Sequence, residues 1–281
     1  MNGESNPNGR ARRPRRSLVL AGAVAIIALV PVLAGLLIGS GSTSRSSAQT
    51  FYTPVAIGAQ RPAPPPRRGP GRPRRASADG VPAGAGALVA LVRHATTMRS
   101  APAGAELAQL GTRTEFGSPA ALWVVSRVRG WLGVISPLAG NGHVGWIPQS
   151  AVALGRVDWK LEVSLSSRRL TVLGGGRPLA SFTIAIGGPA SPTPTGRFAV
   201  TDRLLTGDPS GAYGCCILAL SAHSPHAIQG WTGGNRIAIH STPDSASIGL
   251  PDSHGCMRVT LAEGRWLVSH VPLGTPTLIS T

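Results

Sequence analysis

The chain has 281 residues, of which 27 are basic and 11 acidic, giving a formal charge of +16. Residues 1–82 hold 12 arginines and two acids, so the excess charge belongs mainly to the N-terminal part. A basic balance allows nucleic-acid binding, but no nucleic-acid-binding motif is present, and we expect no such partner. Three cysteines, an odd number, argue against a disulfide framework.

The N-terminal 39 residues combine a basic tail with an apolar run. Residues 1–16 end in an arginine cluster, and residues 17–39 follow without a charge. About 20 apolar residues suffice to span a bilayer as a helix, and arginines ahead of the run favour a cytoplasmic N-terminus. We therefore predict a cytoplasmic tail over 1–16 and an uncleaved transmembrane signal anchor over 17–39. A twin-arginine export signal at Arg15-Arg16 is an alternative.

Residues 40–83 are rich in Ser, Pro, Ala and Arg. Such a composition cannot bury a core, so we predict a disordered linker that acts as an extended spacer. Its arginines would also allow contact with anionic polymers or lipid headgroups of an envelope, which is an alternative role.

Residues 84–155 change to short apolar runs separated by Gly, Pro, Asn and Ser, which is typical of a small all-β domain. Two segments, 131–134 and 141–148, resemble the second half of bacterial SH3-like domains, with Asn141-Gly142 as the expected hairpin turn. The resemblance implies a small β-barrel. Three tryptophans are predicted to lie in the core, with a ligand-stacking surface as the alternative: Trp123, Trp131 and Trp146.

Alternating apolar positions continue through residues 157–281, which we assign to a second domain, and they predict further strands. A short helix is indicated only over 262–270, so we predict a mainly β fold throughout. Adjacent Cys215 and Cys216 leave two alternatives open. They form a vicinal disulfide, or they are two small apolar strand residues that face opposite sides.

Two short strand patterns near the C-terminus carry side chains suited to chemistry. Ile237 and Ile239 predict one buried strand face, so His240 would project from the opposite face. After a polar loop, Cys256 and Arg258 share one face of a second short strand. Neighbouring strands would then direct an imidazole, a thiol and a guanidinium toward one cleft.

A cysteine is nucleophilic as its thiolate, which a free thiol with a pKa of about 8.5 rarely populates at neutral pH. We expect His240 and Arg258 to favour the thiolate of Cys256, and backbone N–H groups around Gly255 and Cys256 to hold an oxyanion. A plainer interpretation is an inert buried cysteine. A metal site of His240, His254 and Cys256 lacks a fourth ligand and the usual ligand spacing, so no metal is expected.

The pattern of His240, then Ser253-His-Gly-Cys256, an apolar residue and Arg258 resembles the signature of L,D-transpeptidase (YkuD) catalytic domains. The upstream segment Thr193–Val200 resembles a strand-turn-strand segment that these domains carry. The resemblance covers the chain from about Asp158 to its C-terminus. It implies a β-rich sandwich with a mixed sheet and little helix.

The same resemblance implies roles for individual residues. Cys256 would be the nucleophile and His240 the general base, with Ser241 holding the imidazole as the third member of a triad. Ser253 would shape the catalytic loop, and Arg258 would bind a substrate carboxylate. The N–H groups expected to form the oxyanion pocket belong to His254 and Gly255.

The activity implied is a cofactor-free transpeptidation on peptidoglycan stem peptides outside the membrane. Cys256 would attack the carbonyl of the third residue of a donor tetrapeptide, release D-Ala, and pass the acyl group to the amine of a neighbouring stem as a 3→3 crosslink. Carbapenems would acylate the same cysteine. The expected location is the cell membrane, with the catalytic domain facing the wall, in a chain of actinobacterial-like composition.

Several alternatives stay open. Water as acceptor would give an L,D-carboxypeptidase, and a protein lysine as acceptor would attach an envelope protein. A cell-wall cysteine peptidase of the NlpC/P60 type fits poorly, because there the cysteine precedes the histidine, whereas here His240 precedes Cys256. A non-catalytic cell-wall-binding protein is the alternative from another functional class.

Overall fold

The structure, a computed structural model, describes residues 53–54, 86–225 and 234–281. The predicted tail and signal anchor (1–39) and nearly all of the predicted linker lie outside the described residues. Among the residues that are described, no helix combines the length and the apolar character needed to cross a membrane.

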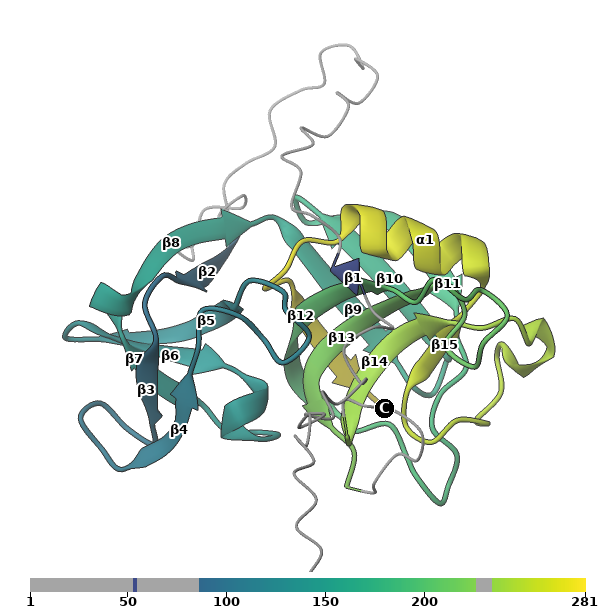
Figure 1. Ribbon diagram of the computed structural model, residues 1–281. Helices are drawn as coiled ribbons and strands as arrows, with labels where there is room; N and C mark the ends of the chain where they lie inside the picture. Colours follow the sequence, from purple (N-terminus) through teal and green to yellow (C-terminus); the bar gives the residue numbers. More distant parts are fainter. Residues whose placement is uncertain (1–52, 55–85, 226–233) are drawn as a thin grey trace, which may run out of the picture. The chain divides into compact units, whose positions relative to one another are not determined.

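Strands β2 to β8 form a seven-stranded sheet in the order β4-β3-β7-β6-β5-β2-β8, and every pairing in it is antiparallel (Figure 1). Their bounds are β2 (Ala87–Val92), β3 (Thr96–Arg99), β4 (Glu106–Leu110), β5 (Ala121–Val128), β6 (Trp131–Ile135), β7 (Gly145–Pro148) and β8 (Val152–Val157). The short strands predicted here are present in a sheet of their own. The resemblance to SH3-like domains stays a prediction.

The three tryptophans of this sheet are half-buried and lie outside its hydrophobic cluster, so their prediction as core residues is wrong. Side chains alternate between the two faces of a strand, and the inward positions are taken by their neighbours. The buried neighbours are Leu122 and Val124 on β5, Leu132 and Val134 on β6, and Ile147 on β7. Each tryptophan therefore lies on the strand face opposite this cluster.

The connection between β6 and β7 is longer than the predicted two-residue hairpin turn, because it contains a 3-10 turn, η2 (Pro137–Ala139). Ser136 caps that turn by accepting a hydrogen bond from the Leu138 N–H at 3.2 Å. Asn141 instead binds the backbone of the next sheet, donating to the His223 carbonyl at 2.7 Å and accepting from its N–H at 2.9 Å.

The remaining strands form a nine-stranded mixed sheet in the order β11-β10-β9-β16-β12-β13-β14-β15, with β1 paired to β12 outside this path. The pairings β14 with β15 and β16 with β9 are parallel, and the others are antiparallel. The bounds are β1 (Thr53–Pro54), β9 (Trp159–Ser164), β10 (Arg169–Gly174), β11 (Arg177–Thr183), β12 (Gly196–Leu205), β13 (Cys216–His223), β14 (Arg236–Ser241), β15 (Met257–Val259) and β16 (Pro276–Ser280). A mainly β fold is thus confirmed for the described residues.

Helix α1 (Leu261–His270) confirms the short helix predicted near the C-terminus and lies along the nine-stranded sheet (Figure 1). It begins with a capping box, in which Thr260 accepts from the Glu263 N–H and the Glu263 carboxylate accepts from the Thr260 N–H. The buried side of α1 contacts β13 and β14. The helix therefore supports the strand that carries His240.

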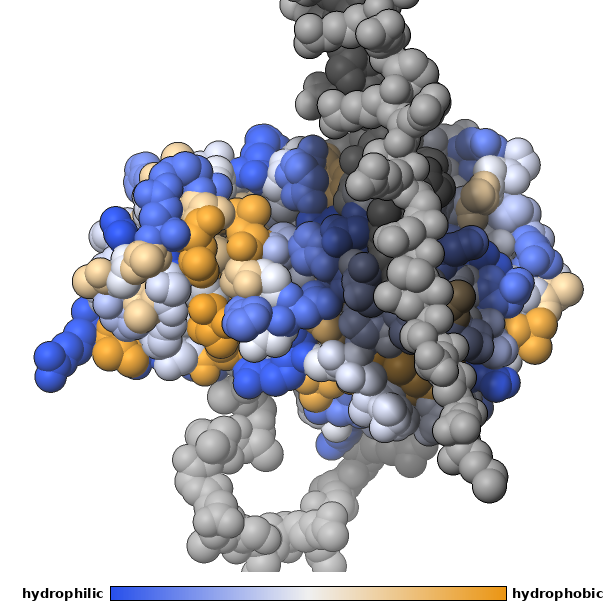
Figure 2. All heavy atoms as spheres, turned by 90° about the horizontal axis from the view of Figure 1, so that it is seen from below, coloured by the Kyte–Doolittle hydropathy of each residue, from blue (hydrophilic) through white to orange (hydrophobic). Residues whose placement is uncertain are grey.

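The surface seen in Figure 2 is mixed, with apolar residues in separate patches among hydrophilic ones. Large exposed apolar side chains are likewise spread along the chain at Leu107, Val128, Leu138, Leu154, Leu179, Leu205 and Leu250. Single exposed apolar residues of this kind are normal on the surface of a folded domain.

Candidate active site

The two strand patterns that carry His240 and Cys256 are neighbours in the sheet, as predicted. Strand β14 pairs in parallel with β15, and His240 lies opposite Arg258 in the register. Cys256 immediately precedes β15. The pairing thus brings an imidazole, a guanidinium and a thiol to one end of the nine-stranded sheet.

The predicted alternation of faces is also confirmed. Ile237, Ile239 and Met257 belong to the main hydrophobic cluster of the sheet. Ala238 and Cys256 belong instead to a separate small cluster, which we call the thiol cluster and which consists of Leu204, Ile217, Ala238 and Cys256. The period of two residues places the thiol on the face opposite the main core.

His240 is buried and held in one orientation. Its Nδ1 lies 2.8 Å from the carbonyl oxygen of Ser241, so Nδ1–H donates and Nε2 is left as the basic nitrogen. The ring of Tyr213 meets the imidazole edge to face, with 4.9 Å between centroids. Burial, assisted by the Arg258 charge and opposed by the Ser241 hydrogen bond, lowers the pKa of His240 to about 4.

Ser241 acts on the imidazole through its backbone, while its side chain has other partners. Its hydroxyl accepts from the Cys216 N–H at 3.1 Å and lies 3.4 Å from the Cys215 sulfur. Cys215 and Cys216 are joined as a vicinal disulfide, which answers the alternative left open by the sequence. Among the described cysteines, Cys256 is the free thiol.

Cys256 is also buried, and burial dominates its ionisation. It raises the pKa of the thiol to about 11, although a backbone hydrogen bond from Ala238 and the Arg258 charge act in the opposite direction. The expected effect of Arg258 is therefore present, but the expectation of a ready thiolate is wrong for this closed site. The thiol faces the Arg236 carbonyl at 4.0 Å, and no hydrogen bond between described residues joins it to the imidazole.

The loop before Cys256 is held by the hydroxyl group of Ser253, which belongs to it, and by a second loop. Gly255 adopts a φ of 109°, which favours glycine, and its N–H donates to Ser253 Oγ at 3.2 Å. The Ser253 hydroxyl donates to the Cys256 carbonyl, so it spans the turn as the predicted shaping residue would. As the site stands, the Gly255 N–H predicted for the oxyanion pocket is engaged by Ser253.

Two supporting residues escaped the sequence analysis. Thr193 accepts from the Gly187 N–H at 2.8 Å and donates to the Gly255 carbonyl at 2.9 Å. Ser191 donates to the His254 carbonyl at 3.0 Å. The Thr-Pro-Thr-Gly segment was the available signal, because its first threonine fastens the catalytic loop.

Arg258 is partly exposed, with 22% of its side chain accessible, and its guanidinium lies 3.6 Å from the Asp252 carboxylate. An exposed pair of this kind is weak, so the guanidinium is available to a ligand carboxylate. Within the described residues, no group of three or more His, Cys, Asp or Glu is arranged to hold a metal ion.

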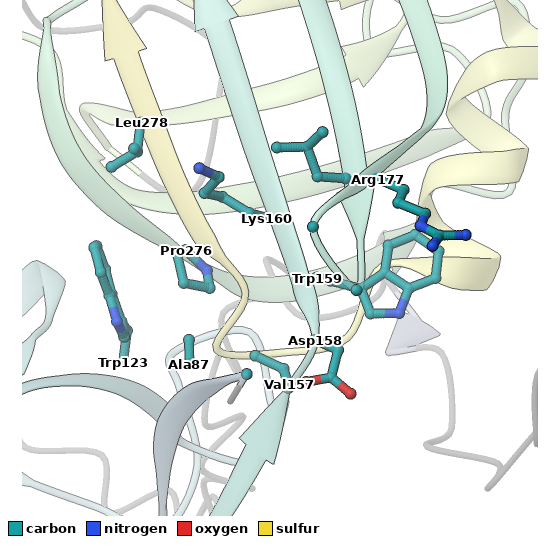
Figure 3. Close-up of a pocket in the computed structure, with 13 residues that line it drawn as sticks. Ala87, Trp123, Val157, Asp158, Trp159, Lys160, Arg177, Pro276 and Leu278 are labelled. Atoms are coloured by element: carbon teal, nitrogen blue, oxygen red, sulfur yellow. The ribbon is translucent and has the colours of Figure 1, made fainter. Parts of the chain in front are cut away.

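A cavity of about 820 Å³ lies elsewhere, between β9, β16 and the seven-stranded sheet (Figure 3). Trp123 and Trp159 stand at opposite sides of it, with Lys160 and Arg177 also on its wall. Its lining contains no cysteine, histidine or serine. The side chains suited to nucleophilic chemistry, Cys256 and His240, therefore lie outside this cavity.

Comparison with known proteins identifies the family of the chain. Residues 158–279 match the family model of the L,D-transpeptidase catalytic domain. Two proteins named putative L,D-transpeptidase YkuD, from Bacillus subtilis and Bacillus licheniformis, are 31% and 30% identical over 124 residues, which are 44% of this chain and 67% of each relative. The chain therefore belongs to the L,D-transpeptidase (YkuD) family.

Solved structures give a weaker likeness. An L,D-transpeptidase from Mycobacterium smegmatis is 20% identical, with 49% of this chain and 73% of that chain covered and a TM-score of 0.34. An L,D-transpeptidase from Mycobacterium tuberculosis H37Rv is 18% identical, with 49% and 72% covered and a TM-score of 0.37. The family assignment rests on the family model and the two relatives.

Proposed function

We propose that this protein is a cysteine-dependent L,D-transpeptidase that forms 3→3 crosslinks in peptidoglycan through a thioester at Cys256. The observation that carries the proposal is the parallel pairing of β14 with β15, which sets His240 beside Arg258 at the strand that follows Cys256. The fixed Nδ1–H of His240 supports it, because a base needs its other nitrogen free.

The first half-reaction acylates the enzyme. The pKa values of about 11 for Cys256 and about 4 for His240 keep the proton on sulfur at neutral pH. His240 Nε2 therefore takes the thiol proton as the sulfur attacks the carbonyl of the third residue in the donor tetrapeptide. Collapse of the tetrahedral intermediate breaks the bond to D-Ala, whose amine leaves with that proton, and a thioester forms.

The second half-reaction transfers the acyl group. The side-chain amine of a neighbouring stem attacks the thioester, His240 accepts its proton, and the Cys256 thiol is regenerated. The intermediate's oxygen would be held by N–H groups of His254 and Gly255, with Gly255 exchanging its bond to Ser253 for the oxyanion. Arg258 would bind a carboxylate of the substrate.

The deciding experiment incubates the full-length chain and Cys256→Ala with a disaccharide-tetrapeptide and follows intact mass and small products together. A transient adduct on the wild type alone, with a 3→3 dimer, is the expected result. An adduct with only tripeptide product would show a carboxypeptidase, and no adduct with wall binding intact would show a binding protein. Carbapenem treatment should add mass to the wild type and leave Cys256→Ala unchanged.

The proposal includes an extracytoplasmic site, reached by an anchor over 17–39 and a spacer over 40–83. It is supported by the uncharged apolar run after clustered arginines. Alkaline phosphatase fused after residue 83 should be active in cells, and deleting 17–39 should abolish that activity. Activity that survives the deletion would refute the anchor as the export element.

A further inference from the structure

The connection between β4 and β5, residues 111–120, belongs to the seven-stranded sheet but contacts the nine-stranded sheet with polar side chains. Thr114 donates a short hydrogen bond to the carboxylate of Asp202 on β12. Glu115 forms an ion pair with Arg236, the first residue of β14. The first contact fastens this connection, which we call the 111–120 loop, to β12, and the second fastens it to β14, the strand that bears His240.

The partners of the loop on the nine-stranded sheet are themselves fixed. Arg236 is 2% exposed and also donates to the Leu220 carbonyl and to Thr201 Oγ1 at 2.6 Å. Asp202 is fully buried. Buried charges of this kind are retained with compensating partners, and removing one partner is costly.

Bonds within the 111–120 loop hold it in one shape. The Thr114 N–H donates to the Ser118 carbonyl at 2.8 Å, and the Ser118 N–H donates to Thr114 Oγ1 at 3.2 Å. Arg113 donates to the Gly117 carbonyl at 2.6 Å. The tip of the loop, Glu115 and Phe116, is thus presented on a closed turn.

Phe116 lies where the loop meets the thiol cluster. Its half-buried ring packs against that cluster, to which Cys256 belongs. The guanidinium carbon of Arg236 is 5.9 Å from the ring centroid, and the Arg236 carbonyl faces the thiol at 4.0 Å. An aromatic side chain from one sheet therefore borders the apolar surroundings of the nucleophile on the other sheet.

We propose that Phe116 is a substrate-positioning residue, whose ring receives the aliphatic carbons of the donor peptide beside the scissile bond, and that Glu115 holds it there through Arg236. The inference rests on the proposed function and adds a specificity residue from outside the matched region 158–279. Cys256 is only 5% exposed, so a donor has to make contact with the apolar side chains around the thiol.

The test compares a peptide with a small electrophile on the full-length chain. For wild type, Phe116→Ala and Phe116→Leu, acylation of Cys256 by the donor tetrapeptide and alkylation by iodoacetamide are both followed by intact mass. Phe116→Ala should raise KM for the peptide about tenfold or more, as loss of an apolar wall predicts. Alkylation should be unchanged or faster, and Phe116→Leu should restore part of the peptide rate.

The matched control is Trp131→Ala, because Trp131 is half-buried in the same sheet and is not packed on the thiol cluster. It should leave both rates unchanged. Equal losses of peptide acylation and alkylation in Phe116→Ala would mean a structural role and overturn the inference, as would no loss in either. If the wild type itself forms no peptide adduct, the proposed function fails and this inference fails with it.

Glu115→Gln tests the ion pair separately from the ring. It should raise KM for the peptide about threefold, because the ring loses one support from an ion pair whose acidic partner is half exposed, while alkylation is unchanged. Glu106→Gln is its control, since Glu106 is exposed and, among the described residues, accepts a hydrogen bond from Gln109 of its own strand. An equal effect of both substitutions would remove Glu115 from the proposal and leave the Phe116 result to stand alone.

Discussion

The two ends of β14 bury titratable groups in opposite ways. At its beginning, Arg236 is ion-paired with Glu115, and the charges of Glu115 and Asp202 offset part of the effect of burial, which lowers the guanidinium pKa. Near its end, His240 has the Arg258 guanidinium as its charged neighbour, and burial lowers the imidazole pKa to about 4. Burial thus leaves Arg236 as a charge offset by neighbouring carboxylates at the beginning of β14, and leaves His240 as a neutral base near its end.

The difference shows how one strand serves both stability and chemistry. A compensated buried charge fixes the strand, because losing a partner is costly. In the proposed mechanism, the neutral imidazole of His240 takes the proton of the Cys256 thiol as the sulfur attacks a substrate. Each end therefore has its own characteristic response to substitution.

The largest effect is expected at the reactive end. His240→Ala should slow acylation of Cys256 about 10²–10⁴-fold, the usual contribution of a positioned general base. The residual rate should rise about tenfold per pH unit toward the thiol pKa near 11, because only pre-formed thiolate can then react. Single-turnover acylation against pH measures this, with exposed His270→Ala as the control. A flat pH profile in His240→Ala would show that another group removes the proton.

Near the beginning of β14, a substitution of Arg236 should affect mainly the stability of the fold. Arg236→Met removes the buried guanidinium that pairs with Glu115 and whose charge also acts on buried Asp202, and it should lower the free energy of unfolding by about 3–5 kcal/mol. The lower value is expected, because burial already raises the pKa of Asp202 and proton uptake would relieve its charge. Urea unfolding measures the loss, with exposed Arg265→Met on α1 as the control. A loss no larger than the control's would remove the distinction between the two ends.

The pH dependence of the free energy of unfolding should reflect the shifted pKa values of His240 and Cys256. Between about 4 and 6.5 the unfolded chain binds a proton that folded His240 does not, so stability falls as pH decreases through this range. Between 9.0 and about 11 the unfolded thiol loses a proton that folded Cys256 keeps, so stability falls as pH rises. Each limb amounts to about 3 kcal/mol at about 1.4 kcal/mol per pKa unit.

Variants that lack one of the two groups separate the acid limb of the stability curve from the alkaline limb. The raised pKa of Asp202 acts against the acid limb, because its contribution grows as pH falls. The difference between wild type and His240→Ala, measured by urea unfolding across pH, isolates the imidazole. Cys256→Ala should abolish the alkaline limb and keep the acid one. An acid limb of full size in His240→Ala would assign it to other groups.

The features that the sequence predicted are those fixed by short, local patterns. The alternation at Ile237, Ile239 and Met257 is enough to place Cys256 on the other face, because the strand period is two residues. The short helix predicted over 262–270 is present as α1, which begins one residue earlier, at Leu261. His240 and Cys256 could be assigned to one site because the sequence placed each of them at a short strand, and these two strands are neighbours in the sheet.

What the sequence did not predict depends on distant contacts. Thr193 supports Gly255 across 62 positions, and Glu115 reaches Arg236 across 121 positions. The tryptophans were misplaced because their size suggested a core role, whereas strand parity decided it. The thiol pKa was misjudged because neighbouring charges are visible in a sequence and burial is not.

An exposed ion pair provides a contrast to the buried charge of Arg236. Lys160 and Glu162 form an ion pair on β9 with 41% and 44% of their side chains accessible. Lys160→Gln should change the free energy of unfolding by less than about 0.5 kcal/mol, and added salt should shrink the change. Urea unfolding beside Arg236→Met measures both in one experiment. A loss at Lys160 comparable with that at Arg236 would mean that burial does not decide what an ion pair contributes here.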